Sequence, residues 1–272
     1  MKVFLKTIFT SEYEVPFIAA QILELDGLLD RIVIVEPQFT HTGLERKLIG
    51  IEKLLSIIPE YSSKIDYVPL LFIPYGIRKS ESDVQSHYNE RVTRGGFVDH
   101  FTLSATDIVI STDSDEIFYR SSVIKSLERL SSRFFSVKAE TFRLHQFMLS
   151  DTYIAPEFKF YGPSIIGAGR YKFKTNYSHW RYAGRVVEDV SGCHFSWCLP
   201  YEQMLTKVEN FAHSFEYGSR KLSARELLDK SIREKTYLLR EPPIKLVDEI
   251  NPEKYWPNGY IKIKNMPLTN LT

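Results

Sequence analysis

The chain has 272 residues, of which 43% are hydrophobic and 25% are charged. These fractions are typical of a folded protein and exclude the disordered, collagen-like and low-complexity classes. The 35 basic and 34 acidic residues leave a formal charge of +1, so overall charge favours neither nucleic acid nor an anionic membrane as a partner. Two cysteines are too few for a disulfide framework, which favours a cytoplasmic location. No apolar run approaches the roughly 20 residues of a transmembrane segment, and Lys2 and Lys6 interrupt the apolar start, so we expect no signal peptide.

The first 120 residues predict alternating strands and helices. Four runs predict strands: Val3–Thr10, Arg31–Glu36, Ile65–Ile73 (closed by a turn at Pro74–Gly76) and Asp107–Thr112. The continuous β-branched run of Arg31–Glu36 is typical of a strand buried on both faces. Apolar residues at helical spacing lie between the four runs, over Phe17–Leu29, Leu44–Ile58 and Val84–Phe101. This alternation predicts right-handed crossovers, and therefore an α/β fold with a mostly parallel, doubly wound sheet and helices on both faces.

The rest of the chain is less regular. It contains an aromatic segment, a glycine-rich stretch and one expected helix, at Phe134–Phe173, Gly162–Gly169 and Ser223–Leu239. We interpret this part as an irregular elaboration on the same sheet. Prolines and aromatic residues from Pro242 onward predict an extended tail packed on the body. We therefore expect a single domain over residues 1–241 and a C-terminal tail over residues 242–272.

Three carboxylates follow the fourth predicted strand. Asp113, Asp115 and Glu116 belong to a loop at its carboxyl end, the edge where open α/β sheets bind ligands. Adjacent like charges repel, and a divalent cation removes that repulsion. Mg²⁺ and Mn²⁺ commonly combine one or two carboxylates with substrate phosphates, so the D-x-D pattern predicts a metal site. The alternative is a solvated acidic turn that caps a helix near Ser121.

A second candidate segment is Ser191–Cys198, in which His194 lies among Gly, Cys, Phe and Trp. A histidine in such surroundings is more often a hydrogen-bonded core residue than a ligand. A zinc site that includes Cys193 and Cys198 is a weak alternative, because their spacing is irregular and no C-x-x-C partner exists. Just upstream, Glu188 and Asp189 could supply a general base or could form a surface turn.

The third candidate segment, Glu36–Gly43, follows the second predicted strand. An acidic residue at this point commonly binds a nucleotide ribose, although Glu36 could equally be an exposed strand end. The chain has no G-x-G-x-x-G motif, no P-loop and no nucleophile elbow. Dinucleotide-binding, P-loop and α/β-hydrolase classes therefore lose their main support.

Taken in order, these segments resemble glycosyltransferase family 17, the family of the β1,4-mannosyl-glycoprotein β1,4-N-acetylglucosaminyltransferase, which has bacterial and viral relatives. The resemblance is carried by Phe9–Glu12, Val33–Glu36 with Phe39, Thr40 and Gly43, Asn89–Glu90 with Arg94, Asp107–Ile110 with Asp113–Ile117, and Gly192–Trp197. Each piece is short, but their order and spacing make the whole specific.

The resemblance implies a GT-A-like fold, with a nucleotide-sugar-binding half over residues 1–120 and an acceptor-side half over residues 121–241. It implies a nucleoside-diphosphate sugar donor, expected to be a UDP-sugar, and Mn²⁺ or Mg²⁺ as the cofactor. By carry-over, the metal would be held by Asp113, Asp115 and His194, and the donor would be contacted by Glu12, Glu36, Arg94 and Asp113. Because the family is inverting, a carboxylate should deprotonate the acceptor hydroxyl. The candidates are Glu188 and Asp189, with Glu140 behind them.

The expected function is thus a metal-dependent, inverting glycosyltransferase, similar to N-acetylglucosaminyltransferases, that acts on a glycan or glycoconjugate in a bacterial or viral-host cytosol. Phe118 and Cys193 replace the usual Pro and Trp of the family, which leaves donor and acceptor preference open. One alternative is a metal-dependent nucleotidyltransferase or phosphohydrolase, since these enzymes also use carboxylates at strand ends. The other is a non-catalytic carbohydrate-binding protein, a class that suits the aromatic content of 14%.

Overall fold

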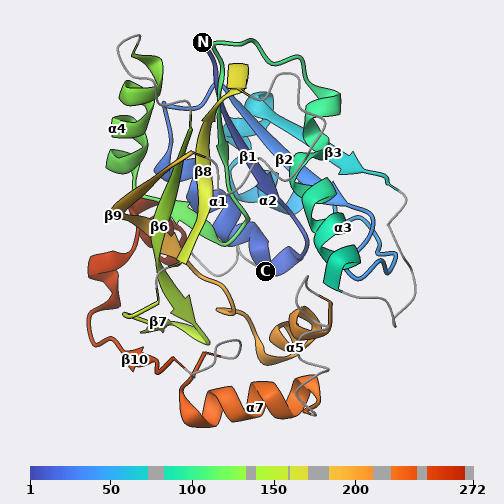
Figure 1. The fold of residues 1–272 in the computed structure, drawn as a ribbon, viewed down its shortest axis with the longest axis vertical. Helices are drawn as coiled ribbons and strands as arrows, with labels where there is room; N and C mark the ends of the chain where they lie inside the picture. Colours follow the sequence, from blue (N-terminus) through green and yellow to red (C-terminus); the bar gives the residue numbers. More distant parts are fainter. Residues whose placement is uncertain are drawn as a thin grey trace.

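Four parallel strands form the first half of the sheet in the computed structural model of the protein (Figure 1). The structure describes residues 1–72, 83–132, 139–158, 160–170, 184–210, 222–237 and 244–266. The parallel strands are β1 (Val3–Ile8), β2 (Arg31–Pro37), β3 (Ile65–Leu70) and β4 (Ile108–Ser111), in the spatial order β4-β1-β2-β3. All four predicted strands are therefore present. Their carboxyl ends meet at one edge of the sheet, as parallel pairing requires.

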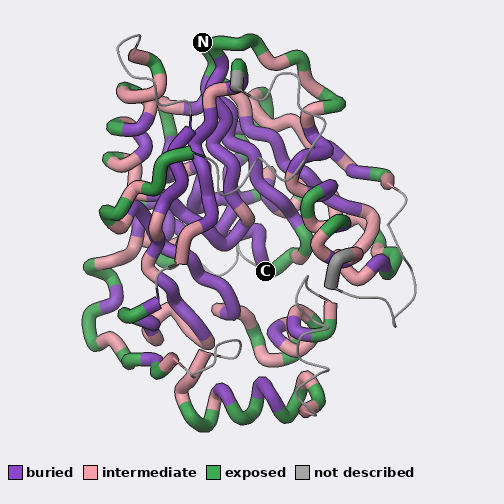
Figure 2. Tube along the Cα trace, in the orientation of Figure 1, coloured by how far each residue is buried: buried purple, intermediate pink, exposed green. Residues whose placement is uncertain are grey.

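Helices cover both faces of these strands. The helices that bracket them in the chain are α1 (Val15–Glu24), α2 (Glu52–Ile57), α3 (Asp83–Gly95), followed by a 3-10 turn at Gly96–His100, and α4 (Arg120–Ser131). Side chains alternate along each strand, so Ile32 and Ile34 pack into the core with α1, while Val33 and Val35 pack with α3. Figure 2 shows the result as a buried sheet between two partly exposed layers. The prediction of helices on both faces is confirmed.

The second half of the sheet is mainly antiparallel. Its strands are β5 (Glu116–Phe118), β6 (Ala139–Met148), β7 (Ser150–Ile154), β8 (Phe160–Gly167), β9 (Arg185–His194) and β10 (Val247–Asp248). Strand β8 pairs with β4 and β6, while β9 pairs with β5 and β6. The aromatic and glycine-rich segments, which the sequence left irregular, are thus largely strands of the same sheet.

A smaller cluster lies beyond the carboxyl ends of the parallel strands, at the bottom of Figure 1. It contains α5 (Tyr201–Asn210) and α7 (Ala224–Glu234), which pack on residues from β6 and from the turn after β9. Trp197, Met204 and Leu228 are buried in it. This third apolar cluster places α5 opposite the ends of β1 and β2.

Three expected elements differ from the structure. The helix expected over Leu44–Ile58 is limited to α2, because Gly50 has a φ of 80° and the loop before it bonds to Glu36. Helix α7 ends at Glu234 because Lys235 adopts a left-handed φ of 52°. The tail is not simply extended, since it contains a 3-10 turn (Pro252–Tyr255) and helix α8 (Asn258–Lys264), which packs on α1.

The predicted turn at Pro74–Gly76 lies outside the described residues, as do the last two residues of the expected helix over Ser223–Leu239. Within the described ranges, none of the helices combines the length and apolarity needed to cross a bilayer.

Candidate active site

The acidic loop, residues 113–116, joins β4 to β5. Gln21 of α1 holds it, because the Gln21 side-chain amide donates to the carbonyl oxygens of Asp113, Ser114 and Glu116 at 2.6, 2.9 and 2.8 Å. Glu116 turns inward, and its Oε2 accepts a hydrogen bond from the backbone N–H of Asp113 at 2.8 Å. Buried hydrogen bonds therefore fix the shape of the loop, and the side chains of Asp113 and Asp115 are directed to other partners.

Strand pairing brings His194 to this loop from the far part of the chain. Glu116 of β5 lies opposite His194 of β9, and the Phe195 N–H donates to the Asp115 carbonyl oxygen at 2.8 Å. The Nε2 atom of His194 is consequently 3.3 Å from Oδ1 of Asp115. The D-x-D pattern and His194, predicted separately from two segments, are thus neighbours.

An amide fixes the orientation of the His194 ring. Nδ1 of His194 lies 2.7 Å from Oε1 of Gln146, whose Nε2 donates to the carbonyl oxygen of Phe147 at 2.9 Å. Since Oε1 of Gln146 can only accept, Nδ1 of His194 carries a proton. Nε2 faces the Asp115 carboxylate, which can only accept, so Nε2 is the ring nitrogen whose proton a cation could replace.

Each aspartate of the D-x-D pattern has a cationic partner. Nη2 of Arg94, from α3, lies 2.8 Å from Oδ2 of Asp113, and Nζ of Lys207, from α5, lies 2.9 Å from Oδ2 of Asp115. Burial alone would raise the pKa of Asp115, but the Lys207 ammonium and then the His194 imidazole hold that pKa below its usual range. Asp115 is therefore a carboxylate at neutral pH.

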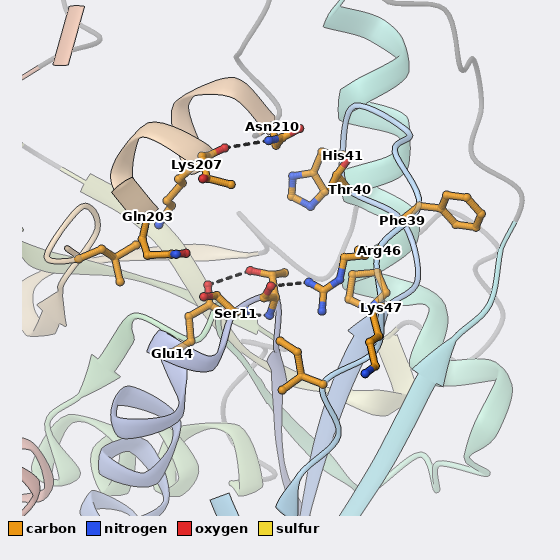
Figure 3. A pocket seen from close by; sticks show the side chains of 15 residues that line it. Ser11, Glu14, Phe39, Thr40, His41, Arg46, Lys47, Gln203, Lys207 and Asn210 are labelled. Carbon is orange, nitrogen blue, oxygen red and sulfur yellow. Dashed lines mark hydrogen bonds between the residues drawn. The ribbon is translucent and has the colours of Figure 1, made fainter. Parts of the chain in front are cut away.

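Lys207, the partner of Asp115, lines a cavity of about 340 Å³ (Figure 3). The segments that follow β1 and β2 form one wall, and α5 forms the opposite wall. Its polar lining includes Ser11, Glu14, His41, Arg46, Gln203 and Lys207. Because Lys207 lines the cavity and also bonds to Asp115, the cavity and the acidic loop are parts of one site.

Glu12, which was predicted to contact the donor, does not line the cavity. The Glu12 side chain is 59% exposed and lies 3.9 Å from Lys53, outside the cavity lining. Glu14 lines the cavity instead, and its carboxylate accepts hydrogen bonds from the backbone N–H groups of Thr10 and Ser11 at 2.7 and 3.1 Å. Burial raises the pKa of Glu14.

Glu36 is fully buried and holds the loop after β2 through hydrogen bonds. Its carboxylate accepts hydrogen bonds from the N–H groups of Ile49 and Gly50 at 2.8 and 3.0 Å, and also from Arg46 and the Tyr67 hydroxyl. These partners use both carboxylate oxygens. Glu36 therefore shapes the wall of the cavity through Arg46 and Ile49, which line it.

The structure does not bring the predicted general bases to the acidic loop. Glu188 and Asp189 are exposed on the first half of β9, where its pairing with β6 is irregular, whereas His194 is buried at the end of the strand. Glu188 accepts a hydrogen bond from the Tyr161 hydroxyl at 3.0 Å. Glu140 is buried and forms a bidentate pair with Arg129, with both N···O distances at 2.7 Å.

The zinc alternative finds no support in the environment of the cysteines. Burial raises the pKa of the Cys193 and Cys198 thiols, and the Cys193 thiol donates to the Tyr255 carbonyl oxygen at 2.9 Å. Among the residues that the structure describes, no three His, Cys, Asp or Glu side chains form a complete metal-binding group. Asp113, Asp115 and His194 are therefore not assembled as a three-ligand site by themselves.

Sequence reasoning did not identify Lys207, Gln146 or His41 as site residues. Lys207 and Gln146 act through residues far away in the chain, and no local pattern marks such pairs. His41 belongs to the segment that follows β2, and its side chain points toward the cavity in Figure 3. Its buried Nε2 has no hydrogen-bond partner among the described residues, and burial lowers the pKa of His41.

Comparison with solved structures finds remote similarity. S. aureus TarS is matched at 10% identity with a TM-score of 0.40, over 78% of this chain and 40% of that protein. A structure of residues 1–349 of TarS is matched at 9% identity and a TM-score of 0.39, over 70% of this chain and 59% of that one. A 4-diphosphocytidyl-2C-methyl-D-erythritol synthase is matched at 10% identity and a TM-score of 0.33, over 62% and 77%. The chain thus spans about half the length of the TarS chains.

The comparison with curated proteins gives no match. The model of the family described as glycosyltransferase family 17 matches residues 1–243, which is most of the chain. The expected family is confirmed, as is the α/β fold class with parallel strands covered by helices on both faces. The protein belongs to glycosyltransferase family 17.

Proposed function

We propose that the protein is a divalent-metal-dependent, inverting glycosyltransferase that moves a sugar from a UDP-sugar to a hydroxyl of a glycan. One observation carries the proposal beyond family membership. The aspartates of the D-x-D pattern and a polar cavity lie at the same edge of the sheet, and Lys207 contacts both. Ligands of open α/β sheets bind at this edge.

The donor set fits a hard divalent cation that is shared with a diphosphate. Asp113 and Asp115 offer carboxylate oxygens, and His194 offers the lone pair of Nε2, all of them ligands accepted by Mn²⁺. Arg94 and Lys207 form ion pairs with Asp113 and Asp115, so the two carboxylates already attract positive charge to this position. A D-x-D site needs no third protein ligand, because phosphate oxygens complete the coordination.

The residues of the site would bind the donor and stabilise the departing diphosphate. When bound, the metal would neutralise the charge that develops on the departing diphosphate. Arg94 and Lys207 add fixed positive charge at the same edge of the sheet. Gln146 keeps Nε2 of His194 directed at Asp115. Helix α5 forms the wall of the cavity opposite the segments that follow β1 and β2.

A binding experiment tests the proposal directly. UDP, GDP, UDP-GlcNAc, UDP-Glc and UDP-Gal are titrated calorimetrically, each with Mn²⁺ and with EDTA, against the wild type and Asp115→Asn. We expect one nucleotide to bind in a metal-dependent manner, and binding to weaken at least 100-fold in the variant, because a ligand and a fixed charge are both lost. Glu188→Gln serves as the control, since this exposed acid lies away from the loop.

Product analysis with the best donor and a panel of glycans then identifies transfer. Normal sugar transfer by Asp115→Asn at saturating donor and Mn²⁺ would contradict the metal role of this residue. Hydrolysis of the nucleotide without transfer to any acceptor would favour the phosphohydrolase alternative. Glycan binding that needs neither metal nor nucleotide would favour a non-catalytic carbohydrate-binding protein.

A further inference from the structure

The Lys207 ammonium lies where a metal ion bound to Asp115 would also lie. Its Nζ lies 2.9 Å from Oδ2 of Asp115, one of the two acids of the D-x-D pattern. The side chains of Lys207 and Asp115 are only 25% and 11% exposed, so solvent screens this pair less than a surface ion pair. The same lysine lines the cavity beside the loop. A divalent ion bound to Asp115 would meet the ammonium at close range.

Packing of helix α5 holds the backbone of Lys207 beside the acidic loop. Helix α5 is anchored by Met204 and Val208, which are buried in the third apolar cluster. The Lys207 ammonium also lies 5.3 Å from the ring centroid of Trp197, a distance at which a cation is attracted to an aromatic face. Trp197 is itself buried, in the short turn that links His194 to α5, and has a φ of 67°. A non-glycine residue in this conformation indicates a turn that is fixed by its surroundings.

We propose that Lys207 is an exchange cation for the D-x-D site. In the ligand-free protein its ammonium neutralises Asp115; when a metal–nucleotide complex binds, the ammonium leaves Asp115 and contacts the diphosphate in the cavity. The inference deepens the proposed function and rests on it. It follows from charge and geometry, since two cations repel at one carboxylate, and the cavity lined by the same lysine offers an anion a place to bind.

The exchange predicts that Mn²⁺ and UDP bind cooperatively. Free Mn²⁺ has to displace the ammonium and therefore binds weakly. UDP supplies the ammonium with a new anionic partner, so UDP strengthens the binding of Mn²⁺. Because coupling between two ligands is reciprocal, Mn²⁺ strengthens the binding of UDP by the same factor.

Lys207→Met tests this exchange, because methionine keeps most of the apolar stem and removes the charge. Binding of Mn²⁺ alone is measured from the electron paramagnetic resonance signal of the free ion, and binding of UDP at saturating Mn²⁺ by calorimetry. We expect about tenfold tighter binding of Mn²⁺ alone and about tenfold weaker binding of UDP. Lys207→Arg keeps the charge and should remain within about threefold of the wild type in the binding of Mn²⁺ alone.

Lys47→Met is the matched control. Lys47 lines the same cavity on the side away from Lys207 in Figure 3, so the variant removes one positive charge from the cavity and leaves the pair with Asp115 intact. We expect its binding of Mn²⁺ alone to stay unchanged. Tighter binding of Mn²⁺ in Lys207→Met but not in Lys47→Met therefore supports the exchange rather than a general effect of charge.

The outcomes separate this inference from the proposed function. If the wild type binds Mn²⁺ with UDP, but Lys207→Met binds Mn²⁺ alone no more tightly than the wild type, the exchange is wrong and the transferase proposal stands. If Lys207→Met weakens Mn²⁺ and UDP alike, Lys207 has only a structural role. If the wild type binds no Mn²⁺ with or without any nucleotide, the proposed function and the exchange both fail.

Discussion

The amide of Gln146 determines which nitrogen of His194 faces the acidic loop. Oε1 of Gln146 accepts from Nδ1 of His194, while its Nε2 is committed to backbone carbonyl oxygens. The ring can therefore offer a lone pair only at Nε2, 3.3 Å from Asp115. Partners that orient a ligating histidine in this way commonly affect metal affinity about 10- to 100-fold. We accordingly assign Gln146 a positioning role.

Gln146→Leu should release the His194 ring, because leucine fills much of the same space in the core but cannot accept a hydrogen bond from Nδ1. With Mg²⁺ and UDP bound, we expect the ¹⁵N resonances of His194 to change from a single form, protonated only on Nδ1, to a mixture that includes the form protonated on Nε2. Mn²⁺ in the presence of UDP should bind about tenfold more weakly, because the lone pair faces the loop for only part of the time.

The tautomer is measured by long-range ¹H–¹⁵N spectra of protein labelled with ¹⁵N-histidine, and the metal affinity by paramagnetic resonance. Unfolding of both proteins in urea controls for a general loss of structure. A variant that loses stability but keeps the wild-type tautomer and metal affinity would contradict the positioning role of Gln146.

At the scale of elements, the pairing of β5 with β9 brings His194 to the acidic loop. The two strands approach closely at Gly192, where an added Cβ would lie 2.2 Å from the carbonyl oxygen of Ile117 and 2.7 Å from Cα of Phe118. Both obstacles are backbone atoms, which cannot rotate away. A glycine two residues before the histidine is therefore required by the sheet itself.

Gly192→Ala should force β9 away from β5 and shift His194 relative to Asp115. We expect a loss of about 2 kcal/mol or more in the free energy of unfolding, because overpacking against backbone cannot relax locally. Metal-dependent UDP binding should fall at the same time. Urea unfolding and calorimetry measure the two effects.

Gly27→Ala gives the comparison. Gly27 has a φ of 74°, but an added Cβ meets only a flexible arginine terminus at 3.9 Å. We expect a cost of about 1 kcal/mol from backbone strain and no change in UDP binding. Equal losses of UDP binding in the two alanine variants would show that the close approach of β5 and β9 does not position His194.

Much of the fold could be predicted because its information is local. Strands β2 and β4 contain the continuous β-branched runs Ile32–Val35 and Ile108–Ile110, and this pattern identifies them without reference to the rest of the chain. The segment before α2 was mispredicted for the opposite reason. Leu44 and Leu48 have helical spacing, but the Ile49 and Gly50 N–H groups bond to Glu36, a partner from another element. A buried carboxylate of this kind outweighs a weak local preference.

In the site, too, local motifs could be predicted and long-range contacts could not. Asp113, Asp115 and His194 could be found from short motifs, whereas the pair of Lys207 and Asp115 depends on how α5 packs. Glu188 and Asp189 were chosen because they precede His194 closely in the chain. Both acids are exposed on the first half of β9, and Glu188 bonds to Tyr161 of β8, so closeness in sequence did not give them the buried environment of His194.

At the scale of the whole molecule, the C-terminal segment is part of the core. The family match ends at residue 243, yet α8, which follows it, packs on α1 through a hydrogen bond from the Gly259 N–H to Oε2 of Glu24 at 2.7 Å. The ring of Tyr260 stacks on Phe195, the residue after His194, with 4.3 Å between ring centroids. The C-terminal segment therefore supports the strand end that carries His194.

Tyr260→Ala should remove this support. We expect the free energy of unfolding to fall by about 3 kcal/mol or more, since a large buried ring leaves a cavity. Tyr260→Phe keeps the ring and loses only the hydrogen bond from the hydroxyl to Asp151, so we expect a cost of about 1 kcal/mol. Calorimetric unfolding compares the two variants. A negligible effect of Tyr260→Ala would mean that the segment after residue 243 is dispensable for the fold.

The hydrogen bonds from Gln21 to the acidic loop have a consequence for the evolution of such proteins. Gln21 binds three main-chain carbonyl groups, and these are present whatever side chains occupy positions 113 and 115. Scaffold and chemistry are thus encoded by different residues. If Asp113 and Asp115 hold the metal as proposed, substitution of both would abolish sugar transfer in a descendant and leave its architecture intact. Inheritance of the architecture alone would then be a poor guide to catalysis, and each descendant has to be judged by its aspartates.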